Sequence, residues 1–137
     1  MKLPKEGVKD PKLELVGLSC RTLDEKNAQD IRIIDVQGLS SITDYFIIAT
    51  GTSEPHLHAL TKEIAYVLKK EGYPIVGHEM RADTGWTVLD AHDVVIHLFV
   101  SEMREHYQLD SLWKDGKTLD LSLFVEAPAP AGQQRGR

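Results

Sequence analysis

GWTVLDAHDVVIHLFV, residues 85–100, is the stretch on which the fold depends. β-Branched and aromatic residues run on both sides of a short polar break, which predicts two strands that turn at Ala91-His92. The second strand has almost no polar side, as is typical of a strand that is covered on both faces. We therefore expect this strand in the middle of a β-sheet.

Three more strands are predicted upstream of this hairpin. Residues 31–36 and 45–50 are apolar and β-branched, and the link 37–43 is too short for a helical crossover, so the two should pair antiparallel. A helix that Ser53 caps follows, and the next strand, 75–79, should lie parallel to the second strand through a right-handed crossover.

Two further helices complete an α/β fold with a mixed sheet of about five strands and helices packed on it. Asp10 and Pro11 predict the start of an amphipathic helix that continues to about Asn27. Ser101 is expected to cap a closing helix over 102–113.

These elements predict one domain over residues 10–113, with a mobile N-terminus over 1–9. Residues 114–137 are expected to form an extended or disordered tail, although the alternation within 119–125 is also typical of a late edge strand.

The composition of the chain narrows the class of protein. A length of 137 residues suits one domain with a single core, and the net charge of -5 argues against binding nucleic acid through a broad basic face. An acidic protein more readily meets a basic partner. The sequence shows neither a membrane span nor an N-terminal leader, which predicts a cytoplasmic protein.

No residue pattern predicts a metal site or a cofactor. His56 and His58 are two residues apart, which does not put them on one helix face, and Gly51-Thr52-Ser53 lacks the glycine spacing of a phosphate loop. Cys20, the only cysteine, lies on an apolar helix stripe and is expected in the core. Asp90 and Asp93 leave open a Mg²⁺-dependent, nucleotidyltransferase-like enzyme, with Asp35 or Asp44 as a further ligand. The spacing of Asp90 and Asp93 is, however, wrong for a shared strand face.

A set of charged and aromatic residues at one end of the sheet is the candidate functional surface. Trp, Tyr and Arg dominate the energetics of protein interfaces, and acidic residues beside them would attract a basic partner. The alternative is that the aromatic residues only complete the core. The candidate residues are Glu79, Asp83, Trp86, Arg104 and Tyr107.

Several motifs in order resemble the Iojap family, the ribosomal silencing factors. They are Asp30-Ile31 to Val36, Gly38 to Asp44, Ala49 to Ser53, Trp86 to Asp90, Asp93 to His97, and Arg104 with Tyr107, Leu109, Leu112 and Trp113. The resemblance covers about residues 11–113. It departs from the family at His92, where a glycine is common, and in the segment beyond Lys117.

The resemblance implies a nucleotidyltransferase-like fold without enzymatic activity. Members of the family bind a basic protein of the large ribosomal subunit at the intersubunit face, and so block subunit joining when nutrients are short. The resemblance implies that Glu79, Trp86, Tyr107 and Leu109 contribute to this contact. RNA contact is expected to be peripheral at most, and a homodimeric scaffold is a third interpretation.

Overall fold

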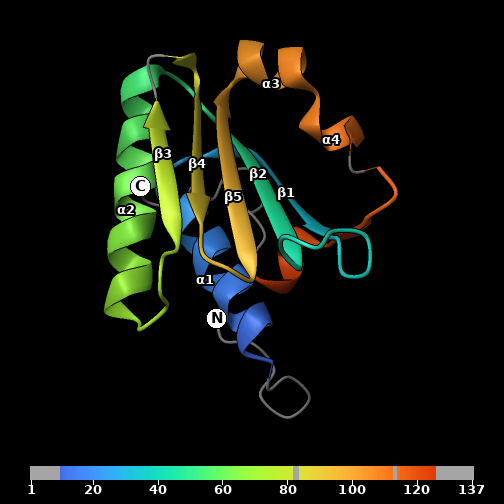
Figure 1. Cartoon of the computed structure of the whole chain (residues 1–137). Coiled ribbons are helices and arrows are strands. Elements are labelled where there is room, and N and C mark those ends of the chain that lie inside the picture. Colours follow the sequence, from blue (N-terminus) through green and yellow to red (C-terminus); the bar gives the residue numbers. More distant parts are fainter. Residues whose placement is uncertain (1–9, 82–83, 113, 126–137) are drawn as a thin grey trace, which may run out of the picture.

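The computed structural model describes residues 10–81, 84–112 and 114–125 (Figure 1). Its elements are, in chain order, α1 (Pro11–Glu25), β1 (Gln29–Asp35), β2 (Tyr45–Gly51), α2 (Glu54–Lys70), β3 (Gly77–Arg81), β4 (Trp86–Asp90), β5 (Val94–Val100), α3 (Ser101–Tyr107), α4 (Leu109–Leu112), β6 (Lys117–Leu119) and the 3₁₀ turn η2 (Leu121–Leu123). Within the described residues, six strands form one mixed sheet in the order β3-β4-β5-β2-β1-β6.

The hairpin of residues 85–100 lies inside this sheet, as predicted. β4 pairs antiparallel with β5, and β5 pairs parallel with β2 on its other side. His92 at the turn has a positive φ of 72°, a conformation in which a glycine is less strained. Val94, Ile96 and Leu98 of β5 enter the main core, while Val95 and Phe99 enter a second cluster on the opposite face. The prediction of a central strand covered on both faces is confirmed.

The order of the remaining strands corrects one expectation in part. β1 and β2 pair antiparallel, as predicted. β3 runs in the same direction as β2, but it pairs with β4 at the edge of the sheet and two strands separate it from β2. The parallel neighbour of β2 is β5, because a strand with two apolar faces is stabilised at the centre, whereas β3 carries the exposed Glu79.

The first two helices cover one face of the sheet. The side chain of Asp10 caps α1 by accepting a hydrogen bond from the amide of Lys12 at 2.9 Å, and Ser53 caps α2 through the amide of His56 at 3.2 Å. Both caps are as predicted. Leucine and isoleucine side chains of both helices pack with the inner residues of β2, β4 and β5 in the main core. Cys20 is fully buried there, and burial raises the pKa of its thiol to about 12.

The predicted closing helix is two helices. Ser101 is the first residue of α3 and makes no capping bond with its side chain, so the predicted cap is wrong. Gln108 adopts the left-handed conformation with φ 51°, which ends α3 at Tyr107 and starts α4 at Leu109. Leu109, the first residue of α4, packs against the second cluster. Helix propensity alone does not predict the break between the two helices, because it takes no account of such tertiary contacts.

The folded domain extends beyond residue 113, where its end was expected. β6 pairs antiparallel with β1, and Phe124 and Val125 are 3% and 9% exposed in the main core. Gly17 of α1 leaves room for this segment, since a Cβ there would lie 3.1 Å from Cδ1 of Phe124. A strand therefore exists in this segment, but at 117–119 and not over the expected 119–125, where Leu121–Leu123 forms the 3₁₀ turn η2. The expectations for residues 1–9 and 126–137 lie outside the described residues. No helix of the described chain is both long and apolar enough to span a membrane.

Candidate docking surface around Trp86

A glycine lets α3 approach the start of β4. Gly85 has a φ of +78° and accepts a hydrogen bond from the amide of Val100 at 3.0 Å. A Cβ at this position would lie 2.6 Å from Cγ of Met103, which is too close for any real contact. The close approach that Gly85 permits brings α3 against the first residue of β4.

Four rings then meet at this end of the sheet, and we call Trp86, His97, Phe99 and Tyr107 the aromatic cluster. The ring centroid of Trp86 lies 4.8 Å from that of Tyr107, 5.5 Å from that of Phe99 and 6.0 Å from that of His97. Phe99 is fully buried, Trp86 is half-buried, and Tyr107 is 44% exposed. The aromatic cluster therefore has a rigid buried base and an exposed edge, which is typical of an anchor in a protein interface.

His97 is a hydrogen-bond acceptor within the aromatic cluster. Its Nδ1 atom lies 3.3 Å from Nε1 of Trp86, whose N–H is the donor. Burial lowers the pKa of His97 to about 4, so the ring is neutral at physiological pH. Phe46 packs against it at a centroid distance of 5.3 Å. The base of the surface is therefore uncharged.

An open hollow lies beside the aromatic cluster. It has a volume of about 380 Å³ and is lined by Glu79, Thr84, Trp86, Val88 and Tyr107. Glu79 and Val88 are paired residues of β3 and β4, and Glu79 is exposed. A carboxylate above apolar and aromatic walls complements a lysine or arginine side chain, whose aliphatic stem can pack while its charge pairs.

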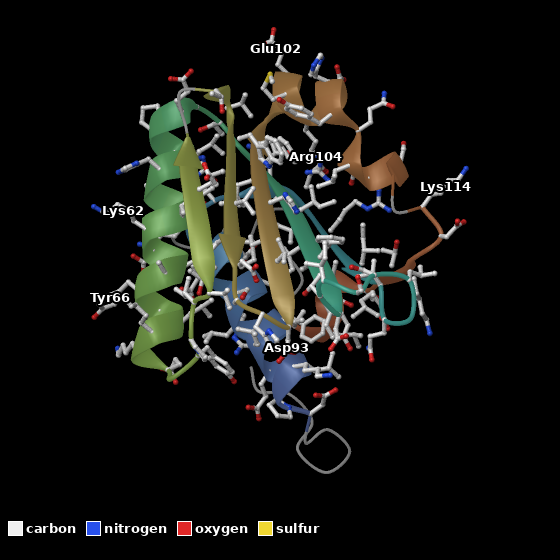
Figure 2. The ribbon with its side chains drawn as sticks, in the orientation of Figure 1. Lys62, Tyr66, Asp93, Glu102, Arg104 and Lys114 are labelled. Atoms are coloured by element: carbon white, nitrogen blue, oxygen red, sulfur yellow. The ribbon has the colours of Figure 1, made fainter. Side chains whose placement is uncertain are left out.

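Arg104 uses its donors inside the chain. Its guanidinium forms two hydrogen bonds with Asp110, at 3.2 Å from Nε and 3.0 Å from Nη2. Its Nη1 also donates to the carbonyl of Asp30 at 2.7 Å and to the hydroxyl of Thr50 at 2.8 Å. With its side chain only 13% exposed, Arg104 fastens α3 and α4 to the ends of β1 and β2 (Figure 2).

The contacts with Arg104 change the pKa of the Asp110 carboxyl. Burial alone would raise the pKa of its carboxyl, but the hydrogen bonds and charge of Arg104, together with the charge of Arg32, outweigh burial and hold the pKa below its usual value. Asp110 is therefore ionised and forms a bidentate ion pair with Arg104. This pair links α3 to α4 across the turn at Gln108.

The structure brings together three of the predicted site residues, namely Glu79, Trp86 and Tyr107, around the hollow. Leu109 is half-buried in the second cluster, and Arg104 is turned inward, so their predicted contact with a partner stays a prediction. Asp83 lies outside the described residues. His97 and Phe99 were not predicted as site residues. Strand register would have indicated them, since they stand beside Val88 and Trp86 across the hairpin.

The aspartates of the alternative enzyme lie at the other end of the sheet. Asp90 ends β4, and its carboxylate accepts a hydrogen bond from the amide of His92 at 2.9 Å, as turn aspartates commonly do. The side chain of Asp44 pairs with Lys12 at 2.6 Å. Among the residues that the structure describes, no three histidine, cysteine or acidic side chains are placed to hold a metal ion together.

Comparison with known proteins agrees with this fold. The family model described as "Ribosomal silencing factor during starvation" matches residues 9–136. A ribosomal silencing factor of Halalkalibacterium halodurans is 33% identical over 108 residues, which cover 79% of this chain and 92% of that protein. The corresponding factor of Haemophilus influenzae is 38% identical over 101 residues, or 74% of this chain and 99% of that protein.

A mouse relative and a solved structure extend the comparison. A mouse protein named mitochondrial assembly of ribosomal large subunit protein 1 is 39% identical over 94 residues, which cover 66% of this chain and 41% of that protein. A crystal structure from Chromobacterium violaceum superimposes with a TM-score of 0.72 at 31% identity, covering 79% of this chain and 89% of that one. The match of the family model and the shared α/β fold lead to one conclusion: the chain belongs to the ribosomal silencing factor family.

Proposed function

We propose that the chain represses translation by occupying a site on the large ribosomal subunit that the small subunit needs for joining. The contact is with a basic ribosomal protein, through the surface formed by Glu79, Trp86 and Tyr107. The observation that carries the proposal is the exposed edge of Tyr107 and Trp86 beside the Glu79 carboxylate, on a chain with a net charge of -5.

This mode of action needs binding free energy and no reacting group. A nanomolar contact corresponds to about 12 kcal/mol, which interfaces of roughly 1,600 Å² with a few aromatic anchors reach. The rigid base under Tyr107 favours this, because a side chain that is already ordered loses little entropy on binding. The name of the family, silencing factor, agrees with a role outside catalysis.

Co-sedimentation with purified large subunits tests the contact. Tyr107→Ala is expected to weaken binding at least tenfold, and Glu79→Lys is expected to weaken it through charge repulsion. Trp86→Ala should also weaken binding while the chain remains folded. Ile42→Ala is the matched control, because Ile42 is 71% exposed in the loop between β1 and β2, at the other end of the sheet. Wild-type affinity in both Tyr107→Ala and Trp86→Ala would contradict the proposal.

The predicted homodimer can be tested independently of the ribosomal contact, with the same purified protein. A dimer that uses the aromatic cluster would compete with the ribosome for Tyr107. The mass in solution, measured for wild type and Tyr107→Ala, separates the two: a wild-type monomer counts against the dimer and leaves the ribosomal contact standing.

A further inference from the structure

The outward face of α2 carries an unusual set of side chains for an acidic protein. Five residues at helical spacing are exposed there, and we call them the α2 stripe: His58, Lys62, Tyr66, Lys69 and Lys70. Lys62 and Tyr66 point away from the sheet in Figure 2. The stripe from Lys62 to Lys70 is about 12 Å long at the helical rise of 1.5 Å per residue.

The positive charge of the α2 stripe is not neutralised by neighbouring side chains. None of its three lysines forms an ion pair with a residue that the structure describes. Glu63 is half-buried on the flank of the helix, and Glu71 is the residue that caps its end. Glu54 is exposed one turn before His58, so the positive charge is confined to the part of the stripe from Lys62 to Lys70, on a chain whose net charge is -5.

Helix stability explains only part of this pattern. Lysines in the last turn, here Lys69 and Lys70, interact favourably with the negative end of the helix dipole. Lys62 lies in the middle of the helix, where that effect has faded. Tyr66 is 61% exposed, although the sheet face of the same helix buries large apolar side chains without difficulty. A ligand of α2 would account for both residues.

We infer that the α2 stripe is an RNA-binding surface, on which the lysines contact phosphates and Tyr66 stacks against an unpaired base. Lysine is depleted in protein interfaces but is common at phosphates, and exposed tyrosines are stacking platforms for bases. A membrane surface fits less well, because the apolar face of α2 is already buried against the sheet. The buried face of α2 packs on one face of the sheet, and Trp86 packs against the second cluster on the opposite face, so the α2 stripe is distinct from the proposed docking surface.

The size of the stripe sets the strength of the contact. Three lysines that neutralise about three phosphates of a single strand give a slope of about -2 in log affinity against log salt. Such a contact is weak alone and agrees with the negative charge of the whole chain. It adds affinity when a second surface holds the protein near the RNA.

Fluorescence anisotropy with a labelled RNA hairpin that has a single-stranded loop tests the inference, at salt concentrations from 50 to 200 mM. Replacing Lys62, Lys69 and Lys70 together by alanine is expected to lower the affinity at least tenfold and to flatten the salt slope. The matched control replaces Lys26, Lys114 and Lys117 by alanine, since these lysines are exposed elsewhere and the change in net charge is the same. This control should bind within about twofold of wild type.

Variants at Tyr66 distinguish the contribution of base stacking to RNA affinity from the contribution of charge. Tyr66→Ala should lower the affinity about fivefold or more with an unchanged salt slope, whereas Tyr66→Phe keeps the ring and should bind as wild type. Cooperative thermal unfolding of each variant confirms that the fold is retained.

Three results would overturn the inference. The first is no RNA binding by wild type at 50 mM salt, and the second is an equal loss of RNA affinity in the two triple variants. The third is that replacing Lys62, Lys69 and Lys70 lowers the affinity for polyglutamate, a polyanion without bases, as much as the affinity for RNA. Trp86→Ala is expected to keep its RNA affinity. A failure of the ribosomal docking surface would therefore leave this assay unchanged, and a failure of the α2 stripe would leave co-sedimentation dependent on Tyr107.

Discussion

The indole N–H of Trp86 donates a hydrogen bond to Nδ1 of His97, over 3.3 Å. A neutral imidazole that accepts at Nδ1 carries its proton at Nε2, so the bond defines the tautomer of His97. The same bond holds the indole ring in the orientation that supports Tyr107. The exposed edge of the docking surface therefore depends on the protonation state of a histidine beneath it.

Folding stability should decrease in mild acid because of His97. Its folded-state pKa of about 4 lies below the ordinary value of 6.5, so the unfolded chain binds an extra proton between these two values and stability is lost as the pH falls through this range. Between pH 7 and pH 5 the loss is about 2 kcal/mol. Urea unfolding at both pH values measures it. His97→Gln should remove that part of the loss, and an identical pH dependence in the two proteins would refute the assignment.

Arg104 should act as a fastener of α3 and α4. Arg104→Ala leaves the Asp110 carboxylate without its two-pronged partner, and the expected cost is about 2 to 3 kcal/mol. Hydrogen exchange should accelerate in residues 101–112 before the rest of the domain. Arg104→Lys keeps the charge but cannot form the bidentate contact, so its stability should lie between those of the wild type and Arg104→Ala.

Arg32 provides the control for this prediction. It also contacts Asp110, at 3.2 Å, but its side chain is 44% exposed, so Arg32→Ala should cost less than about 1 kcal/mol. Equal effects of Arg104→Ala and Arg32→Ala would show that the internal bonds of Arg104 are not what holds the two helices.

The segment after β6 should contribute to the stability of the whole domain. Phe124 is 3% exposed in the main core and Leu123 beside it is 54% exposed, which gives a matched pair of neighbouring positions. Phe124→Ala should lower the free energy of unfolding by about 3 to 4 kcal/mol, and Leu123→Ala by less than about 1 kcal/mol. Thermal unfolding of both variants measures the difference, and a small effect at Phe124 would mean that this segment is not part of the core.

Local signals in the sequence predicted the elements that depend on local chemistry. The caps at Asp10 and Ser53 begin α1 and α2 as expected, and the two apolar faces of β5 indicated its central place. The pairing of strands that are distant in the sequence could not be predicted from such local signals. Nothing near residues 77–81 indicates that β3 takes the edge beside β4, and a three-residue strand such as β6 is too short to produce a period.

The same distinction applies to the docking surface. Trp86 and Tyr107 could be chosen by residue type, because large amphipathic rings outside an apolar run suggest an interface. The inward turn of Arg104 could not, since it depends on Asp110 after the left-handed Gln108 and on Asp30 and Thr50 far away in the chain. A histidine within an apolar strand, such as His97, does not by itself indicate a site residue, and only the register of β4 with β5 shows that it supports Trp86.

Light scattering during the joining of purified small and large ribosomal subunits tests the proposed function most directly. With the wild-type protein in saturating excess over large subunits, the proposed occlusion predicts that the association signal falls at least tenfold, and that Tyr107→Ala at the same concentration restores most of it. Association at the normal rate, with the wild-type protein shown to be bound to the large subunit, would contradict occlusion.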